Sequence, residues 1–334
     1  VQPTPGQPNK LPLRIPVRVA LFDANGAKME TRLGDAPASL EHVVLLEAGS
    51  SQFTFNDVAS QPRASLNRGF SAPIRLADDL TESDRASLAG FDDDAFAQWE
   101  ALQTIARALI LDAVRGGARE PDQARLTAFV QALRHSVTRA TQNDPAYAAL
   151  LLYVPTVGEL ILDVREADPS AIHVVRTHVR RAIARSMEDL LLSVLDKSEP
   201  TSFDASARAA GRRSLRASAL SLLSSLGDRH EGLVAQAYRS ASTMTETLAA
   251  LTALSNIESG AFDTALRDFE TRWKTSPLVM DKWFGVQAMS VRDDLRERLQ
   301  RLLERADYDL RNPNRVRSLA ASFRTHGRAT THGS

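Results

Sequence analysis

The chain has 334 residues, more than the size at which one hydrophobic core keeps growing, so two domains are expected. With 43% hydrophobic and 25% charged residues, the composition is that of an ordinary soluble globular protein. The 41 basic and 41 acidic residues balance, which removes the electrostatic case for binding nucleic acid or an anionic membrane. The absence of cysteine excludes disulfides, thiolate metal sites and a cysteine nucleophile.

The N-terminal stretch, VQPTPGQPNKLPLRIP, has no apolar run of signal-peptide length, and no later run is long enough to cross a membrane. A cytoplasmic protein without membrane contact is therefore expected. The chain starts at Val1, in a proline-rich stretch and without methionine, which favours an internal piece of a longer polypeptide.

Residues 1–77 have the pattern of a small β domain. The run LRIPVRVALF alternates apolar with other residues, which predicts a half-buried strand, and Asn25-Gly26 supplies the chemistry of a turn. Further short runs, EHVVLLEA, SQFTFNDV and NRGFSAPIRL, are separated by Ser, Gly, Asn and Pro. This spacing predicts a small antiparallel β-sandwich.

Residues 80–323 change to a helical period. Thr81 followed by Asp84 resembles a capping box, and the acidic triplet Asp92 to Asp94 is interpreted as a solvated cap at the start of the next helix. That helix carries one apolar stripe and ends at Gly116-Gly117.

More helices follow with short connections. They are predicted at 122–138, 145–152, 156–163, 169–196, 204–226, 231–239, 243–254, 260–273, 277–289, 291–305 and 313–323. A series this long needs an arrangement in which each helix pair buries its apolar face on the next. The predicted fold class is therefore mixed but mainly α: a small antiparallel β-sandwich followed by an α-solenoid-like, armadillo/HEAT-like helical domain.

The histidines are the first candidates for metal chemistry. His173 and His178 lie five residues apart, whereas two zinc ligands on one face of a helix need a spacing of four. The run HEGLV begins as a zinc-peptidase motif, but Val234 stands where H-E-x-x-H requires the second histidine. We interpret His230 and its charged neighbours as a surface cluster at a helix start. No metal ligand is predicted.

Other catalytic signatures are also missing. The sequence has no phosphate-binding loop, no dinucleotide-binding glycine pattern and no G-x-S-x-G nucleophile motif. The basic runs RTHVRRAIAR and AAGRRSLRAS are interpreted as solvated helix faces, with a partner surface as the alternative. An unrecognised hydrolase stays open only because catalytic groups need not be neighbours in sequence.

Several long strings resemble bacterial aminopeptidase N. They are PTPGQPNKLPLRIPVRVALFDANGAKM, QFTFNDVASQPRASLNRGFSAPIRL, TMTETLAAL, SPLVMDKWFGVQA and RNPNRVRSLAASF, in the order and rough spacing of that family. The resemblance runs from Pro3 to about Phe323. It implies membership of the zinc-dependent gluzincin aminopeptidases, which remove N-terminal residues from peptides.

The resemblance implies only the C-terminal part of that enzyme: the end of the β-sandwich at 1–77 and the helical domain at 80–323. The H-E-x-x-H helix, the G-x-M-E-N segment and the catalytic tyrosine of the family have no matching positions here. No catalytic residue is therefore carried over, zinc is expected only in the full enzyme, and the chain alone is predicted to be inactive. Residues 324–334 depart from the family pattern.

The family's helical domain caps the catalytic domain and closes a cavity that admits peptides. The catalytic domain is therefore the implied partner, and peptides are the implied substrates of the full enzyme. In the helix containing NPNRVRS, the resemblance implies an arginine that faces this cavity, at Arg317, and a guanidinium there could hold a peptide carboxylate. A purely structural role for Arg317 is the alternative. For the whole chain the alternative is a free-standing helical scaffold that binds proteins or peptides.

The run SPLVMDKWFGVQA is interpreted as a structural helix. Its apolar residues, Trp283 among them, fall on adjoining helical faces, so packing explains them without catalysis. Asp281 and Lys282 lie off that stripe and are predicted to be a solvated pair.

Overall fold

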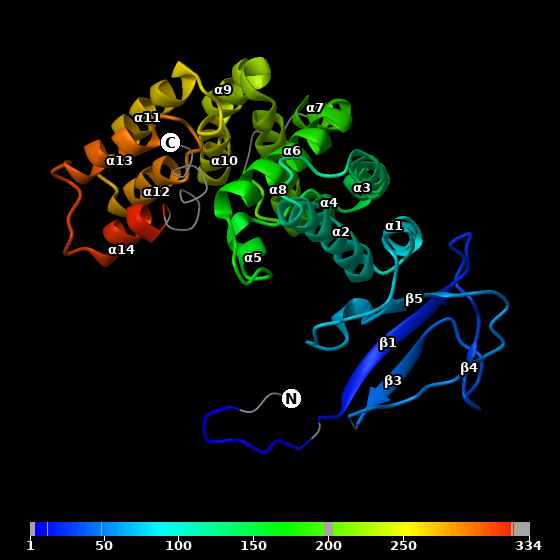
Figure 1. Cartoon of the computed structure of the whole chain (residues 1–334). Helices are drawn as coiled ribbons and strands as arrows, with labels where there is room; N and C mark the ends of the chain where they lie inside the picture. Colours follow the sequence, from blue (N-terminus) through cyan, green and yellow to red (C-terminus); the bar gives the residue numbers. More distant parts are fainter. Residues whose placement is uncertain (1–3, 12, 48, 197–202, 322, 324–334) are drawn as a thin grey trace. The chain divides into compact units, whose positions relative to one another are not determined.

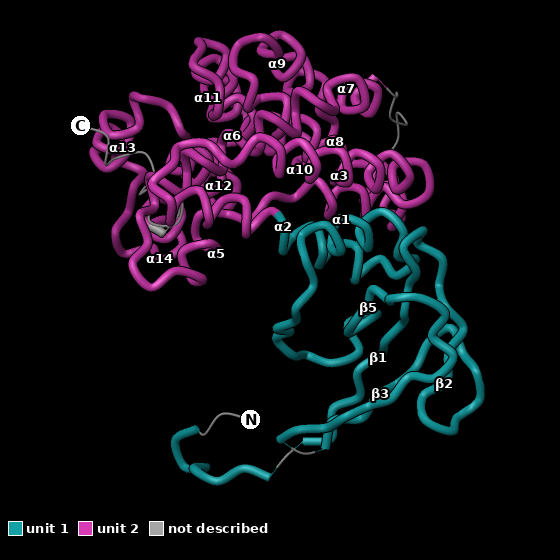
Figure 2. Tube along the Cα trace, turned by 45° about the vertical axis from the view of Figure 1, so that its right-hand side comes forward, with its two compact units in different colours: residues 1–105 teal, residues 106–334 magenta. Residues whose placement is uncertain are grey.

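The computed structural model describes the chain except for residues 1–3, 12, 48, 197–202, 322 and 324–334. A small antiparallel β region precedes a long series of helices (Figure 1), which confirms the predicted fold class. The chain divides into two compact units, residues 1–105 and 106–334 (Figure 2). The domain boundary at 77–80 stays a prediction, and the tail at 324–334 lies outside the described residues.

Two small sheets make up the β region. Its strands are β1 (Ile15–Phe22), β2 (Arg32–Leu33), β3 (His42–Leu46), β4 (Phe55–Asn56) and β5 (Arg63–Leu66). β1 lies between β3 and β5 in an antiparallel sheet, and β2 pairs with β4. In this register Val17 is opposite Val44 and Val19 is opposite Leu66, so the inward residues of β1 form one apolar core with their neighbours.

The second half of β1 departs from simple alternation. Ala20 and Phe22 are buried as well as Val19 and Leu21. Ala20 and Phe22 form a second apolar cluster with Leu88, which lies on the first helix that follows the sheet. A strand covered on both faces loses the polar half of its period-two pattern.

The helices occupy most of the chain. Those of the described residues are α1 (Glu82–Phe91), α2 (Ala95–Arg115), α3 (Gln123–Asn143), α4 (Pro145–Leu151), α5 (Val157–Ile161), α6 (Pro169–Ser186), α7 (Glu188–Asp196), α8 (Ala207–Leu223), α9 (Glu231–Ser240), α10 (Met244–Leu254), α11 (Gly260–Trp273), α12 (Pro277–Ala288), α13 (Leu295–Leu303) and α14 (Pro313–Val316), with short helical turns η1 (Arg68–Phe70), η2 (Ser224–His230) and η3 (Arg317–Ala321). None of these helices is long and apolar enough to cross a membrane.

Two predicted helices are interrupted in the structure. The helix expected at 169–196 is two helices, because Met187 leaves helical geometry and Arg134 binds the free carbonyl of Ser186 there. The helix expected at 313–323 is one turn of α14 followed by the π-helical turn η3. At Ser186 a contact distant in sequence lies at the end of a helix that the local apolar pattern would continue.

One apolar core cluster of the second unit gathers around α9 to α12. Phe262, Phe269 and Phe284 are fully buried in it, and Tyr238 reaches it from α9. Short loops join these helices, and each contributes one apolar stripe to the same cluster. This is the packing expected of stacked helical repeats.

Trp283 confirms the structural interpretation of α12. The side chain is 5% exposed, and its indole N–H donates to the carbonyl of Leu266 at 3.0 Å. The ring meets Phe284 edge-on at 5.1 Å, and the guanidinium of Arg305 lies 4.8 Å from the ring centroid. Trp283 therefore links α12 to α11 through both packing and a hydrogen bond.

The prediction that Asp281 is solvated is wrong. Its Oδ1 accepts from Nε of buried Arg315 at 2.7 Å, and the carboxylate is only 14% exposed. Arg315 also donates to the carbonyls of Asp307 and Pro277, and its guanidinium lies 4.5 Å from the Phe284 ring centroid. The partner lies 34 positions further along the chain, so helical spacing within α12 gives no sign of it.

Replacing Trp283 with alanine is expected to lower the free energy of unfolding by about 3–5 kcal/mol, because a buried aromatic side chain leaves a cavity. Urea unfolding followed by far-ultraviolet circular dichroism measures the loss. Leu278→Ala, at a 70% exposed position of the same helix, is the control and is expected to cost less than about 0.5 kcal/mol. Equal losses would contradict the burial described for α12.

Asp281→Asn is expected to lower the free energy of unfolding by about 3 kcal/mol, because it leaves the buried guanidinium of Arg315 without its carboxylate. The same urea titration measures it. Asp309→Asn removes the partner of Arg311, whose side chain is 92% exposed, and is expected to change stability little. If the two variants unfold alike, the Asp281–Arg315 pair does not hold α14 on α12.

Candidate functional site

Arg317, the one site residue predicted from the sequence, follows α14 directly. It begins the π-helical turn η3, and its side chain is exposed. Asn312 fixes the start of α14 by accepting from the N–H groups of Asn314 and Arg315. Within the described part of the chain, the side chain of Arg317 makes no hydrogen bond or ion pair, whereas its backbone N–H donates to the carbonyls of Pro313 and Asn314. Its guanidinium is therefore available to a ligand, and its role in a cavity stays a prediction.

Arg315 and Arg305, two arginines near Arg317, are already paired with carboxylates. Arg315 is held by Asp281, as described above, and Arg305 binds Glu270 at 2.7 Å and Asp307 at 2.8 Å. Hydrogen bonds to Asp307 raise the pKa of Arg305 above its ordinary value. Of Arg305, Arg315 and Arg317, only Arg317 has a charge that no carboxylate of the described residues neutralises.

The HEGLV segment is not a metal helix. His230 Nε2 lies 3.0 Å from Glu188 Oε1, and Val234 is completely buried. The interpretation as a surface cluster is wrong for His230, whose side chain is 10% exposed, because Glu188 at the start of α7 covers it. In the described ranges no group of three or more His, Asp or Glu side chains could hold a metal ion.

The remaining histidines are dispersed. His178 lies 3.7 Å from Glu120, and His42 bonds the hydroxyl of Thr31 at 3.0 Å. Burial, with the nearby charge of Arg176, lowers the pKa of His173. His326 and His332 fall outside the described residues.

The basic run on α6 is solvated only in part: Arg181 and Arg185 are exposed, whereas the prediction is wrong for Arg176 and Arg180. Arg176 donates to the carbonyls of Pro155 and Val154, and Arg180 donates to the carbonyl of Ser221 at 2.5 Å. Burial lowers the pKa of Arg180 to about 9. In the second basic run, Arg216 donates to the carbonyls of Val194 and Leu195. These arginines bind the ends of neighbouring helices and are not free for a partner.

The acidic triplet is solvated only in part. Asp94 does cap α2, because its Oδ1 accepts from the N–H of Ala97 at 2.8 Å. Asp92 is 1% exposed and bonds Arg68, itself 2% exposed, at 2.5 Å. Burial raises the pKa of Asp92 even with that guanidinium beside it. The triplet therefore positions Arg68 and offers no acid/base pair to solvent.

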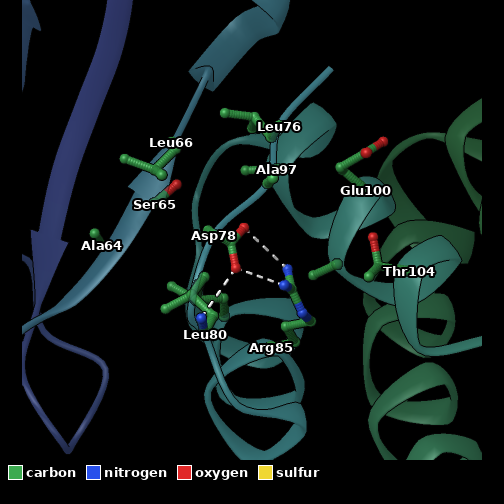
Figure 3. Close-up of a pocket in the computed structure, with 13 residues that line it drawn as sticks. Ala64, Ser65, Leu66, Leu76, Asp78, Leu80, Arg85, Ala97, Glu100 and Thr104 are labelled. Atoms are coloured by element: carbon green, nitrogen blue, oxygen red, sulfur yellow. Dashed lines mark hydrogen bonds and ion pairs between the residues drawn. The ribbon is translucent and has the colours of Figure 1, made fainter. Parts of the chain in front are cut away.

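A small pocket lies in the first unit, between β5 and the first two helices (Figure 3). Its volume is about 180 Å³, and Asp78 and Arg85 face each other across it at 2.5 Å. Ser65 and Thr104 also line it, and the Ser65 hydroxyl already accepts from Arg68. Asp78 and Arg85 pair with each other, so neither of these two charges is free to hold a substrate.

A larger pocket of about 390 Å³ lies between α9 and α11. The hydroxyl of Tyr238 donates to the carbonyl of Ala265 and to Asp268, which also binds Arg272 at 3.3 Å. Burial raises the pKa of Tyr238, so the phenol stays protonated at neutral pH. The half-exposed carboxylate of Asp268 is held between Tyr238 and Arg272.

Sequence reasoning missed two features of these regions. Arg315, two residues before Arg317, is a structural side chain whose carboxylate partner is far away in sequence. In NRGFSAP, the left-handed residues Asn67, Gly69 and Phe70 form a turn that presents Phe70 to solvent. The Asn-x-Gly pattern at this point was the available signal for such a turn.

The chain matches two consecutive family models. Residues 1–79 match a domain of unknown function, DUF3458, described as an Ig-like fold. Residues 82–332 match its C-terminal companion, DUF3458_C, described as ARM repeats.

Curated relatives and a solved structure agree with these models. Aminopeptidase N of Caulobacter vibrioides is 35% identical over 294 residues, which are 87% of this chain and 33% of the relative. Aminopeptidase N of Haemophilus influenzae is 33% identical over 99% of this chain and 38% of its own length. Aminopeptidase N of Escherichia coli is 30% identical over 98% of this chain and 38% of its own length. A crystal structure of Legionella pneumophila aminopeptidase A in complex with aspartic acid has a TM-score of 0.74 at 24% identity, over 94% of this chain and 37% of that one.

This chain thus spans about a third of the length of the relatives that it matches. The predicted resemblance to bacterial aminopeptidase N is confirmed, together with the restriction to the C-terminal part. The chain belongs to the DUF3458 family, as the paired Ig-like and ARM-repeat region that it shares with the aminopeptidases N.

Proposed function

We propose that this chain is the non-catalytic C-terminal part of a zinc-dependent aminopeptidase that removes N-terminal residues from peptides. The observation that carries the proposal is the match of 87–99% of this chain to three aminopeptidases N, of which it forms only 33–38%. The described residues hold no cluster that could bind zinc, so the metal and its chemistry belong to the catalytic domain, the proposed partner. A cytoplasmic location stays a prediction.

In this proposal the helical domain caps the active-site cavity and controls which peptides enter. The exposed guanidinium of Arg317 supports a binding role, because its N–H groups are unpaired among the described residues. The guanidinium groups of Arg315 and Arg305 are instead paired with carboxylates of the chain. An arginine with a free planar fork is suited to a carboxylate, because two parallel N–H groups can meet two oxygens. Arg317 would therefore hold the C-terminal carboxylate of a peptide.

The isolated chain is expected to release no amine from leucine p-nitroanilide, even with zinc added, because the described residues offer no group of three His, Asp or Glu side chains that could hold the ion. Replacing the matched 294-residue segment of Caulobacter aminopeptidase N with this chain gives a chimera. It tests whether this chain can serve as the C-terminal part of an active aminopeptidase. The chimera should turn over the same substrate, whereas the relative lacking that segment should not. Zinc-dependent turnover by the repurified isolated chain would contradict the proposal. A chimera without turnover would favour the free-standing scaffold.

Arg317→Gln in this chimera is expected to raise KM roughly tenfold for a tetrapeptide with a free C-terminal carboxylate, which corresponds to one lost charge-assisted hydrogen bond. KM for the C-terminally amidated tetrapeptide should not change. Arg311→Gln is the matched control, because Arg311 is also exposed but pairs with Asp309. If free and amidated peptides respond alike to Arg317→Gln, Arg317 does not bind the carboxylate.

A further inference from the structure

The first unit carries a hollow lined by three aromatic rings, of which Phe70 is exposed and Phe96 and Trp99 are half-buried. We call it the aromatic hollow; its apolar lining is Phe70, Ile74, Leu76, Phe96 and Trp99, its polar lining is Asn67, Arg75 and Glu100, and its volume is about 520 Å³. The rings of Phe70 and Phe96 are 5.1 Å apart, and those of Phe96 and Trp99 are 6.0 Å apart. Phe70 at the edge is 53% exposed.

The backbone at Phe70 is unfavourable for this residue. Phe70 has φ of 51°, and Asn67 and Gly69 also lie in the left-handed region, at 54° and 61°. Asparagine and glycine tolerate this conformation, whereas a bulky side chain rarely adopts it. A strained residue that also leaves its ring in water is more readily explained by a function than by stability.

Buried polar contacts hold this conformation in place. The Asn67 side chain accepts from the N–H of Ala72 at 2.9 Å and donates to the Ala72 carbonyl at 3.0 Å. Arg68, next to it, is fixed by Asp92 on one side and Glu41 on the other, at 2.5 and 2.9 Å. The turn is therefore held from both sides, so the position of the Phe70 ring is set in advance.

Two of the polar groups at the hollow lack partners among the described residues. Arg75 on its rim is exposed and forms no ion pair within the described residues. The indole N–H of Trp99 is shielded from solvent and has no acceptor in that part of the chain. A pre-positioned apolar pocket beside an unpaired cation is complementary to a segment that carries a bulky apolar side chain next to a carboxylate.

We propose that the aromatic hollow is the surface on which the catalytic part of the same aminopeptidase docks, through such a segment. This inference rests on the proposed function and adds to it the place of contact on the first unit of the chain. The docked side chain would fill the space between Phe70 and Trp99, and its neighbouring carboxylate would pair with Arg75.

Hydroxyl-radical footprinting of the isolated chain and of the chimera defined above tests the contact directly. Phe91 is the matched control, since it is an exposed phenylalanine of the same unit, at 48% against 53% for Phe70. In the chimera, labelling of Phe70 should fall severalfold relative to the isolated chain, while labelling of Phe91 should stay the same.

The variant Phe70→Asn separates docking from folding. Asparagine suits the left-handed backbone, so the isolated variant chain should melt no lower than the wild type. In the chimera the same change should lower the melting temperature by about 4 °C, because the docked side chain loses its aromatic wall. Phe91→Asn should shift both proteins equally.

An active chimera in which Phe70 and Phe91 are labelled as in the isolated chain would overturn the docking surface and leave the proposed function standing. An active chimera that Phe70→Asn destabilises no more than it destabilises the isolated chain would overturn it as well. An inactive chimera would overturn the proposed function and this inference with it.

Discussion

The helical unit depends on how the free carbonyls at its helix ends are satisfied. Each helix leaves its last carbonyl groups without partners inside the helix, and many short helices multiply that cost. Here arginines from other helices supply the donors: Arg134 at the end of α6, Arg180 near the end of α8 and Arg216 at the end of α7. Arg292 does the same after α10, for the carbonyls of Ile257 and Ser259. Arginine suits this role because one planar group can reach two carbonyls and keeps its charge when shielded.

These contacts also explain which parts of the structure the sequence predicts. The capping box of Thr81 with Asp84 and the strand pattern of β1 depend on residues a few positions apart, and both are present in the structure. The roles of Arg180 and Asp281 depend on partners 41 and 34 positions away. A charged residue off the apolar stripe is normally solvated, so local reasoning assigned both to solvent. It failed where the fold brings a distant backbone carbonyl or guanidinium to that face.

The same distinction decides which arginine of the NPNRVRS helix can bind a ligand. Arg315 and Arg317 are two positions apart, so they point in different directions from a helix and from the π-helical turn that follows it. One is buried on Phe284 and neutralised by Asp281, whereas the other is exposed. The structural arginine fixes the turn that carries the free one. A ligand at Arg317 would therefore meet a guanidinium on a backbone that is already ordered.

The buried charges of the first unit fit a role in positioning better than a role in stability. Removing Arg68 and Asp92 from water costs free energy, and their mutual attraction offsets only part of that cost. In addition, one oxygen of Asp92 has no hydrogen-bond partner among the described residues. A purely apolar cluster at this place would serve stability as well. What the ion cluster adds is direction, because Arg68 can satisfy Asp92, Asp93 and Glu41 together only in one orientation. That orientation fixes the neighbouring left-handed turn, and it is the turn that holds Phe70 out in solvent.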